Sequence, residues 1–119
     1  MDIAKNFMLL GADIAAICDS NPERLEAATK KIGPDTAVYA DFDAFLNHGL
    51  DAVVIANYFH EHAPFAIKCF EKGIHVYSEC ISNGTMAEGV ELYRAYKSTK
   101  SIFFLAQTGY SAYNAGIIQ

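Results

Sequence analysis

The sequence has no tryptophan and only three prolines and three cysteines among its 119 residues. Cys18, Cys69 and Cys80 are odd in number and form no CxxC pair. A disulfide framework or a cysteine-rich metal site therefore finds no support in the pattern. We expect free thiols and a cytoplasmic chain.

Positive charge is also scarce. Nine Lys and Arg residues against 14 Asp and Glu residues give a net charge of −5, and no basic run occurs. This balance argues against nucleic acid or an anionic membrane surface as the main partner. The longest apolar runs, about five residues, fall far short of the roughly 20 that cross a bilayer. The first ten residues lack a small-residue cleavage pattern, so we expect no signal peptide.

Apolar material is abundant: 52% of the residues are hydrophobic, including eight phenylalanines and seven tyrosines. This composition predicts a packed core and excludes disorder. Short β-branched runs alternate with helical patterns. Strands are expected at 13–18, 37–39, 51–56, 75–78 and 102–106, and helices at 1–10, 20–32, 41–47, 63–72 and 85–99. The order predicts an α/β fold, a doubly wound, Rossmann-like parallel sheet of about five strands with flanking helices on both faces.

Local signals set some of these boundaries. Ser20 is the expected N-cap of the 20–32 helix, with Glu23 closing a capping box, and Thr85 with Glu88 forms a second box. Asp41 is the expected N-cap of the 41–47 helix. The continuous apolar run at 51–56 is typical of a parallel strand that is covered on both faces.

In open parallel sheets, ligands bind beyond the carboxyl ends of the strands. Asp19 follows the first predicted strand. Its carboxylate can accept both hydroxyls of an adenosine ribose. It can equally serve as a turn residue that helps cap the next helix. Position alone leaves both interpretations open.

The segment 57–62 leaves the strongest strand and enters a helix. A histidine here can hydrogen-bond a ligand or move a proton near neutral pH. His60 and His62 could hold a metal only from a strand, because side chains two residues apart converge there, and no Cys or third His is close in sequence. A polar helix start without a ligand is the plainest interpretation.

Glu79 and Cys80 follow another predicted buried strand. Glu79 can face a cofactor ring or be a simple loop carboxylate. Cys80 can act as a nucleophile only where a basic group lowers its pKa. The sequence nominates no such group, so we expect an inert thiol.

Together these segments resemble the N-terminal half of the Gfo/Idh/MocA family, the group of glucose–fructose oxidoreductase and inositol dehydrogenase. The resemblance covers nearly the whole chain and lies in the order and spacing of several short segments. These are 17–25, 51–56, His60 with His62, 66–76 and Glu79.

The resemblance implies an NAD(P)-dependent oxidoreductase that transfers hydride between a sugar, cyclitol or polyol hydroxyl and nicotinamide. Asp19 would hold the adenosine ribose, which favours NAD because the carboxylate repels a 2′-phosphate. Arg24 keeps NADP open as a cofactor. The other cofactor-binding residues that the resemblance implies are Ser20, Ala56, Asn57, Tyr58, His62, Glu79 and Gln107, and no metal is implied.

Three departures from the family pattern matter. The sequence contains no G-x-G-x-x-G turn, whose backbone amides form the main anion site for the pyrophosphate. Cys80 occupies the usual Lys position of a Glu-Lys-Pro triplet, so no catalytic residue is assigned. The third departure is that we expect the family's C-terminal substrate domain to lie outside this chain. We therefore expect a partial NAD(P)-binding Rossmann domain at 1–106 and the start of the connection to the substrate domain at 107–119.

Two other functions remain open beside an inactive fragment of an oxidoreductase. One is a non-catalytic nucleotide-fold module for binding or assembly, and the other is an NAD-retaining relative that cleaves glycosides. In the strand order 3-2-1-4-5-6, the first family strand lies between those at 13–18 and 51–56. Without it, these strands either pair directly or leave two half-sheets with bare edges. Bare edges predict marginal stability and association into a homo-oligomer.

Overall fold

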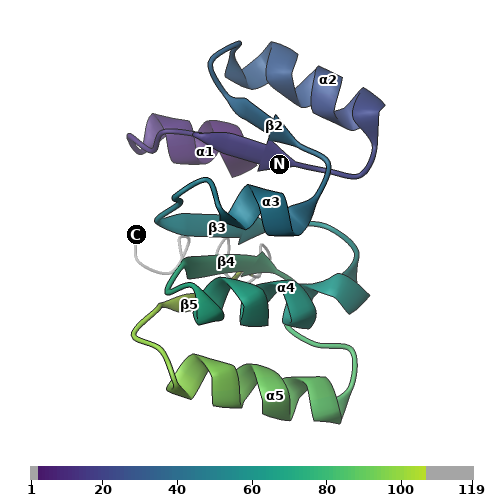
Figure 1. Cartoon of the computed structure of the whole chain (residues 1–119), viewed down its shortest axis with the longest axis vertical. Coiled ribbons are helices and arrows are strands. Elements are labelled where there is room, and N and C mark those ends of the chain that lie inside the picture. Colours follow the sequence, from purple (N-terminus) through teal and green to yellow (C-terminus); the bar gives the residue numbers. More distant parts are fainter. Residues whose placement is uncertain (1–2, 107–119) are drawn as a thin grey trace, which may run out of the picture. The chain divides into compact units, whose positions relative to one another are not determined.

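The computed structural model describes residues 3–106, in which helices and strands alternate regularly (Figure 1). In chain order these are α1 (Ile3–Leu9), β1 (Ala16–Cys18), α2 (Pro22–Ile32), β2 (Ala37–Tyr39), α3 (Phe42–Leu46), β3 (Ala52–Ile55), α4 (Phe59–Glu71), β4 (His75–Glu79), α5 (Met86–Lys97) and β5 (Phe103–Ala106). Within this range no helix has the length and apolarity needed to cross a membrane.

The chain forms two compact units, Met1–Leu50 and Asp51–Gln119. In the first unit β1 pairs in parallel with β2, and in the second β3, β4 and β5 form a parallel sheet in that order. The predicted parallel α/β class is confirmed. Among the described residues no ladder joins the two sheets, as in the half-sheet alternative of the sequence analysis.

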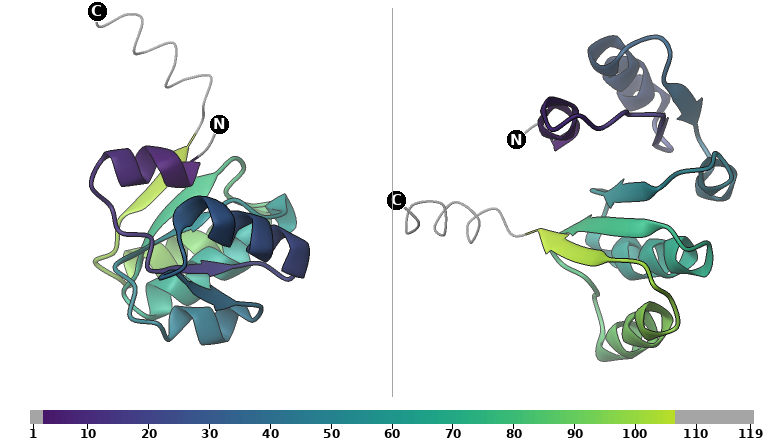
Figure 2. Two further views of the ribbon diagram at one scale, coloured as in Figure 1. Left: turned by 90° about the horizontal axis from the view of Figure 1, so that it is seen from above. Right: turned by 90° about the vertical axis from the view of Figure 1, so that its left-hand side faces the viewer.

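The core of the second unit lies between its sheet and α4. α4 contacts both β3 and β4, and α5 packs against α4 on the same side of the sheet (Figure 2). The buried apolar side chains of this layer are Val53, Ile55, Ala63, Ala66, Cys69, Phe70, Ile74, Val76 and Leu92. Removing apolar surface from water at about 25 cal/mol per Å² makes this layer the main source of the unit's stability.

The opposite face of the same sheet is open. Val54, Tyr77 and Phe104 are register neighbours on this face, and the rings of Tyr77 and Phe104 stack with centroids 5.2 Å apart. Val54 is 42% and Phe104 52% exposed. The prediction that the 51–56 strand is covered on both faces is therefore wrong for the described residues. The strands follow one another in the same direction, so right-handed crossovers place α4 and α5 on a single face.

The first turn of α2 corrects one prediction. The N-cap is Asn21, whose Oδ1 accepts hydrogen bonds from the backbone N–H groups of Glu23 (2.9 Å) and Arg24 (3.4 Å). Ser20 is not the cap, and the expected box with Glu23 does not form. Pro22 explains the shift, because proline with its fixed φ and absent N–H suits the first helical position directly after the cap.

The start of α4 also differs from the sequence prediction. The helix begins at Phe59, four residues before the expected start at 63, and its N-cap Tyr58 makes no side-chain capping bond. The signal that usually marks a helix start, a capping Ser, Thr, Asp or Asn, is thus absent at this position. By contrast, the caps predicted at Asp41 and at Thr85 with Glu88 are confirmed.

Candidate functional site

Asp19 directly follows β1, where its two carboxylate oxygens have different surroundings. Oδ1 accepts a 2.8 Å hydrogen bond from the backbone N–H of Asn21, the N-cap of α2. Oδ2 lies 3.8 Å from Nη1 of Arg24, and the side chain is 33% exposed. One oxygen therefore supports the helix start while the other faces Arg24 and solvent. Asp19 can therefore help to cap α2 with one oxygen and remain available to accept a ligand hydroxyl with the other.

Arg24 and Ser20 flank Asp19 on the surface of the first unit. Both residues are exposed, and the Arg24 side chain is 62% accessible. An ion pair between solvated groups contributes only about 0–1 kcal/mol. Arg24 can therefore leave Asp19 for a ligand phosphate at little cost.

Cys18 precedes Asp19 at the end of β1. Burial, followed by the charges of Asp41 and Asp19, raises the pKa of the Cys18 thiol. The group stays a neutral thiol at physiological pH, because thiolate formation would add negative charge beside two carboxylates. Asp19 is thus the anionic group at this strand end.

The carboxyl end of β3 carries an exposed segment with Ala56, Asn57 and Tyr58. The Asn57 Nδ2 donates a 2.7 Å hydrogen bond to Oε2 of Glu61 on α4. The Tyr58 ring is 62% exposed and lies parallel to the His60 ring, with centroids 5.9 Å apart. This segment offers a polar group and an aromatic face to solvent at the strand end.

His62 is enclosed instead of exposed, with 2% of its surface accessible. Its Nδ1 lies 2.7 Å from the carbonyl oxygen of Ile81, and its Nε2 lies 3.1 Å from the carbonyl oxygen of Asn57. The ring therefore connects the segment after β3 to the segment after β4. His60 and His62 share no ligand position, because one is exposed on Tyr58 and the other is buried between carbonyls.

Glu79 is the last residue of β4 and is half-buried, whereas Cys80 is exposed. The Cys80 thiol donates to the carbonyl oxygen of Ala106 over 2.8 Å. The thiol therefore contacts a backbone acceptor at the end of β5. The remaining predicted residue, Gln107, lies outside the described residues.

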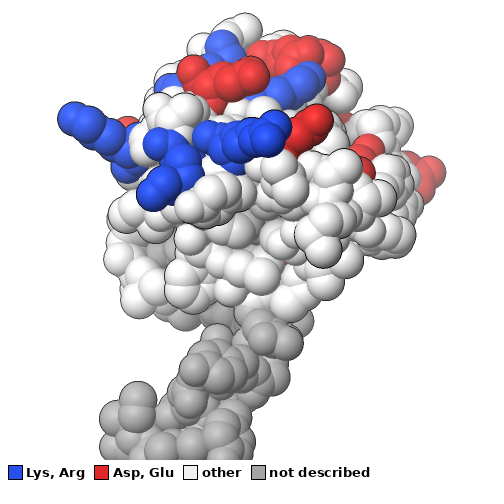
Figure 3. Space-filling model, turned by 90° about the horizontal axis from the view of Figure 1, so that it is seen from below, with Lys and Arg blue, Asp and Glu red and all other residues white. Residues whose placement is uncertain are grey.

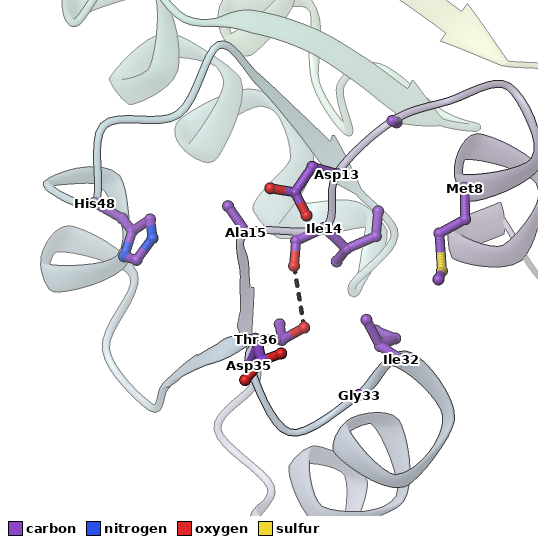
Figure 4. A pocket seen from close by; sticks show the side chains of 10 residues that line it. Met8, Asp13, Ile14, Ala15, Ile32, Gly33, Asp35, Thr36 and His48 are labelled. Atoms are coloured by element: carbon purple, nitrogen blue, oxygen red, sulfur yellow. Dashed lines mark hydrogen bonds between the residues drawn. The ribbon is translucent and has the colours of Figure 1, made fainter.

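A hollow of about 450 Å³ opens elsewhere in the first unit (Figure 4). It lies beside the amino ends of β1 and β2, where Thr36 Oγ1 donates a 3.1 Å hydrogen bond to the Ile14 carbonyl oxygen. None of the predicted site residues lines it. Parallel sheets bind ligands at the opposite, carboxyl ends of their strands, so we do not assign the cofactor to this hollow.

The described residues also offer no gathering of three or more His, Cys, Asp or Glu side chains that could hold a metal ion. The predicted site residues instead form two separate groups. Asp19, Ser20 and Arg24 follow β1 in the first unit, and Ala56, Asn57, Tyr58, His62 and Glu79 surround the strand ends of the second.

A family model described as "Oxidoreductase family, NAD-binding Rossmann fold" matches residues 3–107. The chain belongs to the Gfo/Idh/MocA family. The membership, the Rossmann-like class and NAD as the cofactor, all predicted from the sequence, are confirmed.

Solved structures give the same fold. The WlbA dehydrogenase from Bordetella pertussis, in complex with NADH and UDP-GlcNAcA, is 26% identical with a TM-score of 0.80, over 89% of this chain and 35% of that protein. The myo-inositol 2-dehydrogenase from Lactobacillus plantarum is 23% identical with a TM-score of 0.75, over 81% and 29%. A probable dehydrogenase from Thermotoga maritima is 24% identical with a TM-score of 0.78, over 87% and 31%. This Gfo/Idh/MocA chain thus spans about a third of these proteins.

The chemistry of Asp19 fits an adenosine ribose, since Oδ2 is an acceptor that faces Arg24 and, within residues 3–106, accepts no backbone hydrogen bond. The family's glycine-rich turn, which binds the pyrophosphate, does not occur in this sequence. The Gfo/Idh/MocA residues present therefore suit the ribose and the strand ends, and they do not include the main phosphate site.

Proposed function

We propose that this chain is a cofactor-binding part of an NAD-dependent oxidoreductase that transfers hydride between a sugar or polyol hydroxyl and nicotinamide. The observation that carries the proposal is the match of the NAD-binding family model to residues 3–107. The WlbA dehydrogenase from Bordetella pertussis, described with NADH and a sugar nucleotide, supports the substrate class.

In the first unit, Asp19 accepts the adenosine ribose hydroxyls through Oδ2. The Asn21 N–H fixes the carboxylate through Oδ1, so the acceptor is oriented before the ligand arrives. A 2′-phosphate would meet the negative charge of Asp19, which favours NAD. Arg24 can neutralise part of that repulsion, which keeps NADP as a weaker alternative.

In the second unit, Asn57, Tyr58 and Glu79 contact the cofactor from the ends of β3 and β4. Tyr58 offers an exposed aromatic face, and Asn57 a side-chain amide already oriented by Glu61. The nicotinamide, when bound, exchanges the hydride with the substrate carbon. Cys80 holds its own proton against a carbonyl oxygen, so it supplies no base for the substrate hydroxyl. We expect no turnover by this chain alone.

Fluorescence titration of the chain with NADH tests the proposal. We expect saturable binding that the Asp19→Asn variant weakens about tenfold, the effect of losing one charge-assisted hydrogen bond. Glu91→Gln, which removes an exposed carboxylate on α5, is the matched control and should bind like the parent chain. Absence of binding at millimolar NADH would contradict the proposal and favour a module for binding or assembly.

A further inference from the structure

Two backbone segments at the strand ends of the second unit are joined by one buried side chain. His62 lies on α4, and its ring nitrogens face the carbonyl oxygens of Asn57 after β3 and Ile81 after β4. In the sequence, Asn57 lies five residues before His62, and Ile81 lies 19 residues after it.

The ring is held between two backbone acceptors. A carbonyl oxygen only accepts, so a ring nitrogen that hydrogen-bonds to either carbonyl group does so as the donor. The ring nitrogens lie 2.7 Å from the Ile81 oxygen and 3.1 Å from the Asn57 oxygen, so the rigid ring sets the spacing between the two segments.

We propose that His62 is a positioning residue whose buried ring fixes the segment after β3 to the segment after β4. Asn57 and Tyr58 lie on the first segment, and Glu79 directly precedes the second. The inference rests on the proposed function in one respect, that these three residues contact the cofactor. Removal of the ring frees both carbonyl groups, so the segments separate more easily and the cofactor binds more weakly.

Amide hydrogen exchange and NADH titration of His62→Gln test this assignment. The flexible glutamine side chain cannot contact both carbonyl groups from opposite ends of a rigid ring. The matched control is His75→Gln at the other end of β4, where the ring accepts one backbone hydrogen bond from Ile102. We expect His62→Gln to lose protection at 57–61 and 79–82 and to bind NADH about tenfold more weakly, roughly the effect of one hydrogen bond. The His75→Gln control should keep the amide protection of both segments and the NADH affinity of the parent chain.

The distribution of the exchange separates positioning from simple packing. His62→Gln should lose protection at the two segments while the rest of the second unit stays protected as in the parent chain. If His62→Gln does not fold, exchange in the parent chain decides, because amides at 57–61 and 79–82 should then open together at one rate. Independent opening of the two segments, or equal protection in the two variants, would overturn the proposal. Failure of the parent chain to bind NADH would instead contradict the proposed function and leave the exchange comparison to decide the role of His62.

Discussion

At the residue scale, we propose that the pair of Asp19 and Arg24 governs which dinucleotide the first unit accepts. Nη1 of Arg24 lies 3.8 Å from Oδ2 of Asp19 on a partly solvated surface, so each side chain can turn to a ligand. In this proposal the charge of Asp19 repels a 2′-phosphate and favours NAD, whereas Arg24 could attract that phosphate.

We therefore expect Asp19→Asn to narrow the gap between NADH and NADPH affinity, and Asp19→Asn with Arg24→Gln to weaken NADPH again. Parallel fluorescence titrations with NADH and NADPH measure the ratio of their dissociation constants. A ratio that does not change in the single variant would show that Asp19 does not contact the ribose.

The three thiols should differ sharply in reactivity. Burial raises the pKa of Cys69 to about 12. At pH 8 its thiolate fraction is then about one part in ten thousand, compared with about one in ten at the ordinary value, since each unit is a factor of ten. Cys80 is exposed and Cys18 half-buried with a raised pKa.

We expect iodoacetamide at pH 8 to label Cys80 first, Cys18 slowly and Cys69 only after unfolding, as peptide mass spectrometry can follow. Labelling of Cys69 in the folded chain at a rate close to that of Cys80 would contradict this assignment.

The sequence allowed the position of some site residues to be predicted, but not the surroundings of others. Asp19 could be selected by position, because the end of a strand before a helix is visible in the sequence. The arrangement at His62 could not, because its partner Ile81 is 19 residues away and offers only a backbone carbonyl. Backbone acceptors carry no sequence signal, so the burial of this ring appears only in the folded chain.

At the scale of elements, the cap of α2 gives a direct test. Asn21→Ala should lower the free energy of unfolding by about 1 kcal/mol, because it removes the acceptor for two backbone N–H groups. Ser20→Ala should change it by only a few tenths of a kcal/mol, within the usual range for exposed surface positions. Urea unfolding followed by circular dichroism measures both. Equal losses in the two variants would restore Ser20 as the cap.

The elements themselves were largely predictable, and their ends were less so. The strand at 37–39 and the capping box of Thr85 with Glu88 follow from local patterns, and both agree with the structure. The start of α4 at Phe59 lacks a capping side chain, so the pattern predicted the helix only from residue 63. Likewise, the apolar run of β3 could not indicate that Val54 is exposed, because that depends on which side the crossover helices take.

At the scale of the molecule, the open face and open edges of the sheets predict association. Val54, Tyr77 and Phe104 form an apolar row on the open face, and within the described residues β3 has a ladder partner on one side only. Charged side chains gather toward one side of the surface in Figure 3, and the rest of that view is almost uncharged. Apolar surface next to unpaired strand edges favours self-association.

We expect the sedimentation coefficient of the chain to rise with concentration, and Phe104→Lys to reduce that rise. Met86→Lys is the control, since Met86 is 84% exposed but lies on α5, away from the sheet face. A monomer at all concentrations that unfolds cooperatively above about 60 °C, the upper part of the mesophile range, would contradict the expectation.

The all-parallel pairing has a consequence for how the chain reaches this structure. Ala16 pairs with Ala37, Ala52 with His75 and Val76 with Phe103, so every ladder joins strands separated by a complete helical segment. Parallel strands cannot be joined by a tight hairpin, and a long loop must close before the first ladder bond forms. As the chain leaves the ribosome, β3 has no strand partner until β4 has been synthesised, and the apolar face of α4 is the earliest surface that can cover it. Helix formation should therefore precede strand pairing in each unit, and β3 is the strand that waits exposed to incorrect partners during synthesis.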